Sequence, residues 1–306
     1  MKKLSEGRKM YLSVMVIFAV YAIIFILFED YDRTHILPFE ETSDWHLLMF
    51  SIVVMVGLGV LLHRYSQRMD QRINEEQEAK KNQMRRELTQ NIAHELKTPV
   101  ASILGYTDTM LEHPDMEDQT RQQFLERTQS QAHRLTALLQ DISTLNRMDY
   151  AASLIQIQPT NVSHIVSDII EETSLAASNK QMTVMNLLPQ NIVVKGNQSL
   201  IYSIFRNLLD NAINYAGHGT TVQITAKEGS EQWRFTFADN GNGITPEHLS
   251  RIFERFYRID KSRSRSLGGT GLGLAIVKNA VLLHGGNIKA KPTPGGGLCF
   301  EFSLKK

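Results

Sequence analysis

One histidine has neighbours that could make it a nucleophile. It lies in the run A-H-E-L-K-T-P, residues 93–99. Glu95 is adjacent and could hold one nitrogen of the His94 imidazole, which leaves the other nitrogen neutral and free to attack. Thr98 is one helical turn further on, on the same face as His94. Pro99 removes a helical hydrogen bond and is expected to bend the helix at this point.

Two asparagines could hold a metal ion. Asn207 and Asn211 belong to the run N-L-L-D-N-A-I-N-Y, residues 207–215. Their spacing of four places both amides on one face of a helix, opposite an apolar stripe. Amide oxygens suit Mg²⁺ that keeps waters and phosphate oxygens as its other ligands. Because asparagine is a poor residue for a helix interior, the pair favours a site over two solvated side chains.

Asp239 follows an alternating strand pattern that contains Phe235 and Phe237. Its carboxylate could accept a hydrogen bond from the amino group of adenine. Gly241 and Gly243 come directly after it and would let the backbone pass close to a base. The alternative is an ordinary Asp/Gly turn.

The glycine-rich run G-G-T-G-L-G-L, residues 268–274, leads into an apolar helix. Free amides at a helix N-terminus bind phosphate. The run fits neither the dinucleotide-binding pattern nor the P-loop pattern, because the required last glycine and the Lys-Ser/Thr pair are missing. A basic stretch at 261–265 could approach a triphosphate. The aromatic run before it, 252–258, is either the base of a lid or part of the core.

Two amphipathic helices must carry His94. Apolar residues recur at helical spacing from Leu88 to Leu111 and again from Phe124 to Leu145, with a break at residues 113–115. Two antiparallel helices cannot enclose a core by themselves, whereas two copies can form a four-helix bundle. The hairpin is therefore expected to form a homodimer.

From about residue 150 the pattern changes to short strands and helices. Strands are expected near 154–157, 183–185, 192–195, 222–226, 233–237 and 298–304, with a helix after Pro159 and another at 200–213. The cap of the first helix is Asn161 or Thr160. This order predicts an α+β layered domain, with helices on one face of a mixed sheet.

The composition of the 306 residues excludes several classes of protein. The net charge of +1 argues against a dedicated nucleic-acid binder and against an acidic disordered chain. Cys299 is the single cysteine, so a disulfide framework within the chain and a metal site with several cysteines are both excluded.

Two uncharged runs of 18 residues, 11–28 and 45–62, predict a pair of transmembrane helices. A cleaved signal peptide is the alternative for the first run, but no small-x-small cleavage site follows it. Lys and Arg flank the outer ends of both runs, so both termini are expected in the cytoplasm. The loop between them, 29–44, has a net charge of −5. It is either a solvated turn or a sensor of a cation or a cationic peptide.

Together these motifs resemble those of the sensor histidine kinases of bacterial two-component systems. H-E-L-K-T-P at 94–99 is similar to the phosphoacceptor box of this family. The later motifs resemble, in order, the nucleotide-binding boxes of its gyrase/Hsp90-like ATPase domain. The resemblance covers roughly residues 84–306.

The resemblance implies a protein that uses ATP and Mg²⁺, lies in the bacterial inner membrane and passes phosphate to a response regulator. It implies that His94 is phosphorylated, that Glu95 is its acid/base partner and that Thr98 serves in dephosphorylating the regulator. Asn211 would be the main Mg²⁺ ligand, with Asn207 nearby. The implied ATP contacts are Asn207, Asn211, Tyr215, Asp239, Gly241, Gly243, Gly269, Thr270, Gly271, Leu272 and Gly273.

Three positions depart from the family pattern. Asn214 replaces a frequent basic residue, Asn197 a frequent acidic residue and Leu298 a common threonine. A relative that hydrolyses ATP for conformational work and a scaffold with a decayed ATP site are the rival functions. The expected organisation is a membrane hairpin at 1–62, a polar helical connector at 63–83, a phosphotransfer hairpin at 84–149 and an ATP-binding domain at 150–306. No globular sensor domain fits in the 16 residues of the loop 29–44, so the signal is expected from within the membrane or from a neighbouring membrane protein. The family's usual linker domain before His94 is also expected to be absent.

Overall fold

The computed structural model describes residues 23, 43–150, 155–260, 269–293 and 295–306. The chain divides into two units, residues 1–82 and 83–306. The expected first membrane run, 11–28, lies outside the described residues except for Ile23. Within the described residues, no helix is both long enough and apolar enough to cross a membrane.

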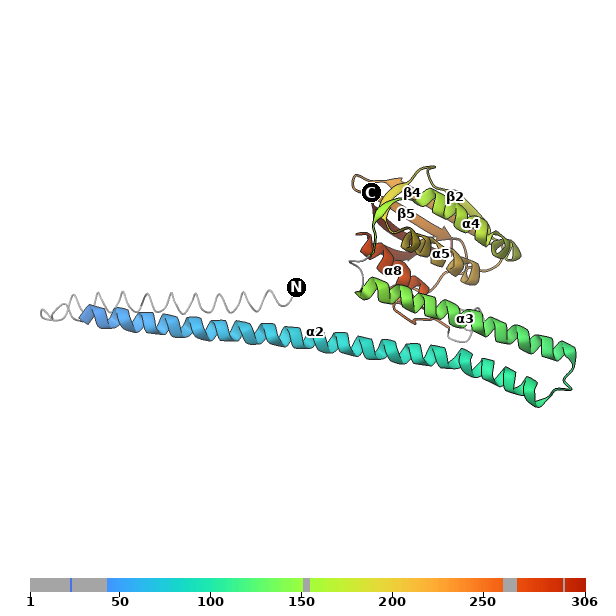
Figure 1. The fold of residues 1–306 in the computed structure, drawn as a ribbon. Helices are drawn as coiled ribbons and strands as arrows, with labels where there is room; N and C mark the ends of the chain where they lie inside the picture. Colours follow the sequence, from blue (N-terminus) through green and yellow to red (C-terminus); the bar gives the residue numbers. More distant parts are fainter. Residues whose placement is uncertain (1–22, 24–42, 151–154, 261–268, 294) are drawn as a thin grey trace. The chain divides into compact units, whose positions relative to one another are not determined.

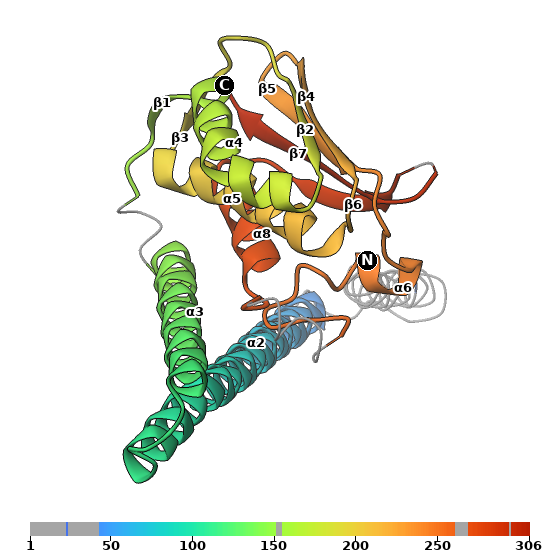
Figure 2. The same cartoon turned by 90° about the vertical axis from the view of Figure 1, so that its right-hand side faces the viewer.

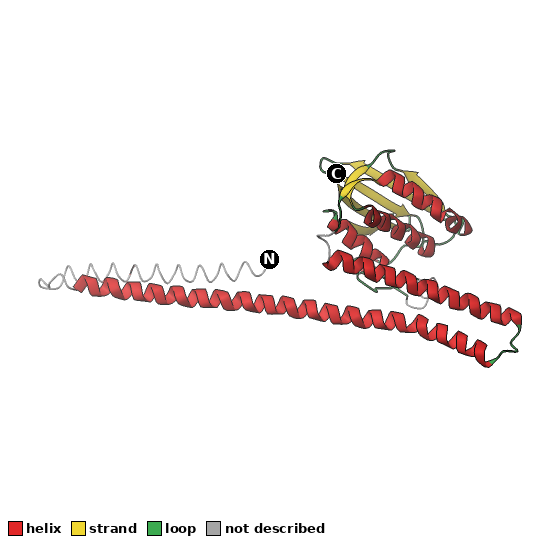
Figure 3. Cartoon of the chain, viewed as in Figure 1, coloured by secondary structure: helices red, strands yellow, loops and turns green. Residues whose placement is uncertain are grey.

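Two long helices dominate the N-terminal half of the described chain (Figures 1 and 3). Helix α2 spans Ser43–Glu112 and includes Pro99, and helix α3 spans Asp118–Tyr150. The predicted break at 113–115 is confirmed. The Arg121 guanidinium closes this turn by donating to the carbonyl oxygens of Pro114 at 2.8 Å and Met116 at 3.1 Å. Tyr106 and Phe124 pack across the hairpin with ring centroids 5.4 Å apart.

A mixed five-stranded sheet forms the frame of the C-terminal domain. Its order is β2-β4-β5-β7-β6, in which only β2 and β4 are parallel. The strands are β2 Thr183–Leu187, β4 Thr221–Glu228, β5 Gln232–Asp239, β6 Ile288–Pro292 and β7 Leu298–Lys305. A separate antiparallel pair joins β1, Gln158–Asn161, to β3, Val193–Gly196.

Three helices cover one face of this sheet (Figure 2). They are α4 Val162–Asn179, α5 Gln198–Tyr215 and α8 Gly273–Leu283, while the short α6 spans Pro246–Leu249. The rings of Phe205, Phe235 and Phe302 lie 5.2–5.5 Å apart in the core between α5 and the sheet. The predicted α+β layers with a mixed sheet are therefore confirmed.

The strand expected at 154–157 is wrong. Leu154 lies outside the described residues, and the ladder begins only at Gln158, opposite Gly196. Ile157 is half exposed, whereas Thr160 is buried and donates its hydroxyl to the Gly196 carbonyl at 3.1 Å. Burial of Thr160 thus decides where β1 pairs with β3.

Asparagine side chains cap two of the covering helices. The Asn161 side chain accepts from the His164 amide at 3.1 Å at the start of α4, which decides between the two expected caps. Asn197, one of the departures from the family pattern, accepts from the Leu200 amide at 3.1 Å and starts α5. An asparagine therefore meets the capping requirement at a position where the family often has an acid.

His284 connects α8 to the start of α5. Its side chain is buried, its Nε2 accepts from the Asn197 amide at 2.9 Å, and its Nδ1 lies 2.6 Å from the Ala280 carbonyl oxygen. Gly196 packs against the same ring, because a Cβ there would come within 2.7 Å of it. Burial lowers the pKa of His284, since the charged ring is disfavoured there, although the Ala280 carbonyl opposes this shift.

Acidification is therefore predicted to destabilise this domain through His284. Below about pH 6.5 the His284 imidazole is protonated in the unfolded chain but stays neutral in the folded domain. The free energy of unfolding therefore falls as the pH decreases toward the lowered pKa of the folded state. The loss is at most about 1.4 kcal/mol per pH unit. Urea denaturation between pH 7.5 and 5.5 measures it, and His284→Gln should reduce the slope. Equal slopes for the two proteins would contradict the prediction.

Candidate nucleotide-binding and phosphoacceptor site

A cavity of about 700 Å³ opens beside the C-terminal half of α5. It is bounded by α5, the end of β5, the segment 242–259, the glycine-rich loop and the start of α8. Nine of the eleven residues implied as ATP contacts line it: Asn207, Asn211, Tyr215, Asp239, Gly243, Gly269, Thr270, Gly271 and Gly273. Segments that are more than 60 residues apart in the sequence thus meet at one site.

Packing of α5 turns its asparagines toward this cavity. The apolar stripe of the helix is buried, including Ile201, Ile204, Phe205 and Leu208. Asn207 Nδ2 donates to the Ser203 carbonyl at 2.8 Å, so Oδ1 is the atom left for a ligand. This oxygen points at the start of α8, because a Cβ on Gly273 would lie 2.5 Å from it.

The residues present fit a hard cation that is shared with phosphates. Amide oxygens one helical turn apart on α5, facing a loop of backbone amides, are a donor set that suits Mg²⁺. Among the described residues, no cluster of three or more His, Cys, Asp or Glu side chains could hold a metal. Asn207 and Asn211 are the residues that would hold the ion.

Asp239 ends β5 with its carboxylate buried. Oδ1 accepts from the amides of Gly241 at 2.9 Å and Leu298 at 3.2 Å. Burial raises the pKa of Asp239, and the two amides partly oppose this shift. Gly297 is required beside it, because a Cβ there would lie 2.0 Å from the Asp239 carbonyl oxygen.

The glycine-rich loop wraps the N-terminus of α8. Gly271 has φ +73°, and its carbonyl accepts from the Phe256 amide at 2.8 Å. A Cβ at this position would also crowd Phe256 and the Arg258 guanidinium at 3.1 Å. Glycine is therefore demanded both by the backbone angle and by close packing.

Two residues of the motifs lie behind the lining. Leu272 is fully buried in the core and anchors the loop. Gly241 packs against the end of α5, since a Cβ there would lie 2.3 Å from the Ala216 carbonyl oxygen. Both residues stabilise the shape of the site, and neither lines its surface.

Asp210 and His248 also line the cavity, although neither was singled out from sequence. The His248 Nδ1 lies 2.6 Å from the Tyr257 hydroxyl, and the Arg251 guanidinium lies 4.4 Å from the centre of the Tyr257 ring. The aromatic run 252–258 is divided between the core and the cavity lining, and the lid that sequence also allowed stays a prediction. Phe253 packs against the core, with its ring centre 6.1 Å from that of Phe300, while Tyr257 and Arg258 line the cavity. The expected basic stretch 261–265 lies outside the described residues.

The phosphoacceptor motif lies on α2. His94 is exposed, and the Thr98 hydroxyl donates to the His94 carbonyl at 3.3 Å. The Glu95 carboxylate is mostly buried and accepts from Arg134 of α3 at 3.3 Å and from Arg258 at 3.2 Å. The hairpin and the ATPase domain thus share one carboxylate.

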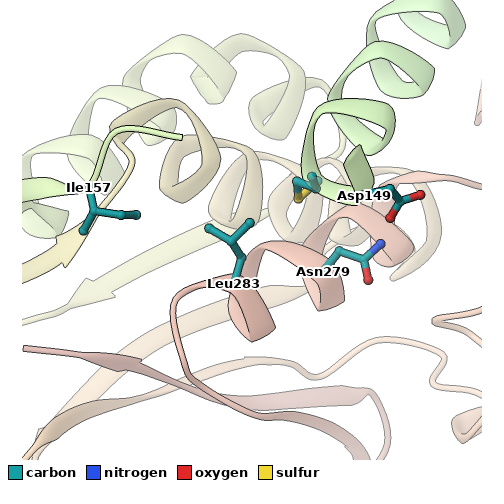
Figure 4. A pocket seen from close by; sticks show the side chains of 5 residues that line it. Asp149, Ile157, Asn279 and Leu283 are labelled. Atoms are coloured by element: carbon teal, nitrogen blue, oxygen red, sulfur yellow. The ribbon is translucent and has the colours of Figure 1, made fainter. Parts of the chain in front are cut away.

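A second hollow, of about 480 Å³, lies between the end of α3 and α8. Figure 4 shows Asn279 and Leu283 of α8 facing Asp149 and Ile157 across it. None of the residues singled out for chemistry lines this hollow. We therefore place the candidate chemistry in the larger cavity.

Two families of known domains match the chain. Residues 84–151 match the His Kinase A (phospho-acceptor) domain, and residues 196–306 match the histidine kinase-, DNA gyrase B- and HSP90-like ATPase. Sensor-like histidine kinase SenX3 of Mycolicibacterium smegmatis is 36% identical over 220 residues, which are 72% of this chain and 57% of the relative. The chain belongs to the sensor histidine kinase family. Phosphate regulon sensor protein PhoR of Pseudomonas aeruginosa is 32% identical over 219 residues, which are 71% of this chain and 49% of PhoR.

Solved histidine kinases share the fold of this chain. Full-length ShkA in complex with AMPPNP gives a TM-score of 0.52 at 26% identity, covering 69% of this chain and 44% of ShkA. AdeS of Acinetobacter baumannii gives 0.56 at 21% identity, covering 69% of this chain and 97% of AdeS. The chain spans about half the length of the curated relatives that it matches.

Asp239→Asn is predicted to separate nucleotide affinity from stability. The Asn oxygen can still accept from the Gly241 and Leu298 amides, and no charge is buried, so the free energy of unfolding should change by less than about 1 kcal/mol. If Asp239 receives the amino group of adenine, as the sequence predicts, loss of its carboxylate should weaken ADP binding by about tenfold or more. Calorimetric titration with ADP measures this effect, and unchanged affinity would remove Asp239 from base recognition.

Proposed function

We propose that this protein is an ATP-dependent protein-histidine kinase that phosphorylates itself on His94. The proposal rests on one observation. The Asn207/Asn211 face, Asp239 and the glycine-rich loop converge on a single cavity, and a side chain of that cavity, Arg258, reaches the residue next to His94. The ATPase family match and the solved complex of ShkA with AMPPNP support ATP as the occupant.

In this proposal the adenine lies against Asp239 and the phosphates lie along the glycine-rich loop. Amides at the start of α8 and the Arg258 guanidinium supply positive charge there. A bound Mg²⁺, held by Asn207 and Asn211, would neutralise phosphate charge. Phosphoryl transfer needs mainly alignment and charge neutralisation, which this arrangement can provide.

The transfer forms one bond and breaks another. A neutral nitrogen of the His94 imidazole attacks the γ-phosphorus, the bond from that phosphorus to the bridging oxygen breaks, and ADP leaves. Glu95 can take the proton from the other ring nitrogen, which keeps the phosphohistidine neutral at the ring. The phosphoryl group then passes to an aspartate of a response regulator, which frees the His94 nitrogen. Thr98 assists the later hydrolysis of that acyl phosphate, in which water attacks the phosphorus and inorganic phosphate leaves the aspartate.

We propose that the hairpin works as a homodimer. Large apolar side chains on both of its helices are exposed in the single chain: Val100, Leu104, Leu111, Leu125 and Leu139. Leu111 is the most exposed of them, at 79%. A second hairpin would cover such a face in a four-helix bundle.

We also propose that residues 11–28 and 45–62 anchor the kinase in the bacterial inner membrane with both termini in the cytoplasm. The lengths of the two apolar runs and the basic residues at their outer ends support this. The signal would come through the bilayer, from a neighbouring membrane protein or from a ligand of the acidic loop 29–44. Alkaline carbonate extraction of membranes tests the anchor, and release of the chain into the supernatant would exclude it.

Incubation with γ-labelled ATP is predicted to label the protein through a phosphoramidate bond. The label should be acid-labile and base-stable, and His94→Gln should abolish it while ADP affinity stays within about twofold, because His94 does not line the cavity. Intact-mass analysis and label stability measure the phosphorylation, and calorimetric titration with ADP measures the affinity. Acid-labile label that persists in His94→Gln would contradict the assignment of His94. ATP hydrolysis without any phosphohistidine would favour the conformational ATPase, and binding without turnover would favour the scaffold.

A further inference from the structure

The hairpin reaches the lining of the large cavity through two carboxylates. Glu95 of α2 accepts from Arg258, and Asp141 of α3 accepts from the Thr270 hydroxyl at 2.6 Å. Arg258 and Thr270 both line the cavity. Each contact therefore joins an acid of the hairpin to a donor that faces the nucleotide position.

Arg258 is shared between the two domains. Its side chain is only 6% exposed, and one nitrogen, Nη2, donates both to Glu95 at 3.2 Å and to the Gly269 carbonyl in the glycine-rich loop. Glu95 is itself only 20% exposed. A guanidinium placed this way cannot turn fully toward a phosphate while it keeps its bond to Glu95, because its donors point in fixed directions.

Asp141 of α3 makes a similar contact with Thr270, the second cavity residue that the hairpin reaches. Thr270 lies in the middle of the glycine-rich loop, and its oxygen also accepts from the Leu272 amide at 3.2 Å. Burial raises the pKa of Asp141, the Thr270 hydroxyl opposes this and the nearby Asp210 adds to it. Its contact with Thr270 places Asp141 beside the loop expected to hold phosphate, where the ionised carboxylate would repel a triphosphate.

We propose that Glu95 and Asp141 compete with the nucleotide phosphates for Arg258 and Thr270. Nucleotide binding then withdraws these donors from the hairpin and releases Glu95 for its part at His94. The inference rests on the proposed function and assigns positioning roles to Arg258, Thr270 and Asp141. Because linkage is reciprocal, removing either hairpin carboxylate must strengthen nucleotide binding.

A matched control exists in the same interface. Arg255 donates to both carboxylate oxygens of Asp149, at 2.8 and 2.9 Å, and so also joins the ATPase domain to the hairpin. Neither residue lines the large cavity, and Asp149 borders the smaller hollow instead (Figure 4). Loss of this pair weakens docking without freeing a donor at the nucleotide position.

Titration of the full chain with AMPPNP tests the competition. Glu95→Gln and Asp141→Asn should each tighten binding by about fivefold or more. Asp149→Asn should leave the affinity unchanged. In the Arg258→Ala background, Glu95→Gln should lose its effect, because the shared donor is gone.

Three outcomes would overturn the inference. They are unchanged or weaker binding in Glu95→Gln, an equal gain in Asp149→Asn, and a gain from Glu95→Gln that persists without Arg258. The readout is binding alone, so it is separable from the kinase assignment. The predicted affinity pattern without any phosphohistidine would defeat only the proposed function, and phosphohistidine without the pattern would defeat only the competition. A chain that binds no AMPPNP would defeat both.

Discussion

Burial of one stripe of α5 is the constraint on which the site depends. Ile204, Phe205 and Leu208 are almost fully buried, and Phe205 meets Phe235 and Phe302 edge-on at 5.5 Å. Rotating the helix to expose this stripe would forfeit about 1.5–3 kcal/mol for each large apolar side chain. The helix is therefore locked in rotation, and Asn207 and Asn211 on its other face must look into the cavity. Leu272 of the glycine-rich loop is buried in the same core, which helps to hold the loop beside the cavity.

Carboxylates of the hairpin bind donors that line the cavity of the ATPase domain. The cavity has positive donors at Arg258 and at the start of α8, and the hairpin offers carboxylates to the donors on its side of the cavity. The hairpin must approach the nucleotide for phosphoryl transfer to take place. The same approach brings the hairpin carboxylates close to the nucleotide phosphates. Ion pairs with cavity residues offer a physical means to hold the domains together without nucleotide charge, and to exchange that contact when phosphate arrives.

The elements that could be predicted from sequence are those whose pattern lies within a few neighbouring residues. The apolar period of α5, the turn at 113–115 and the alternation in β5 and β7 each arise from a few neighbouring residues, and the structure has them at those positions. Pairing between distant segments was not predictable in the same way. The contact of Glu95 with Arg258 spans 163 positions, and β1 starts at Gln158 because a buried threonine finds its partner 36 residues later. Leu272 and Gly241 look like cavity residues in the motif, yet their roles in packing emerge only from the assembled core.

Photolabelling with 8-azido-ATP tests the placement of the nucleotide most directly, because the reactive nitrogen sits on the adenine ring. Ultraviolet irradiation of the chain with the probe, digestion and mass spectrometry would identify the labelled peptide. Our account predicts label on the end of α5 or on the segment that follows Asp239, lost when excess ATP is added and reduced in Asp239→Asn. ATP-protectable label confined to peptides around the smaller hollow, such as those with Asn279 or Ile157, would contradict the account.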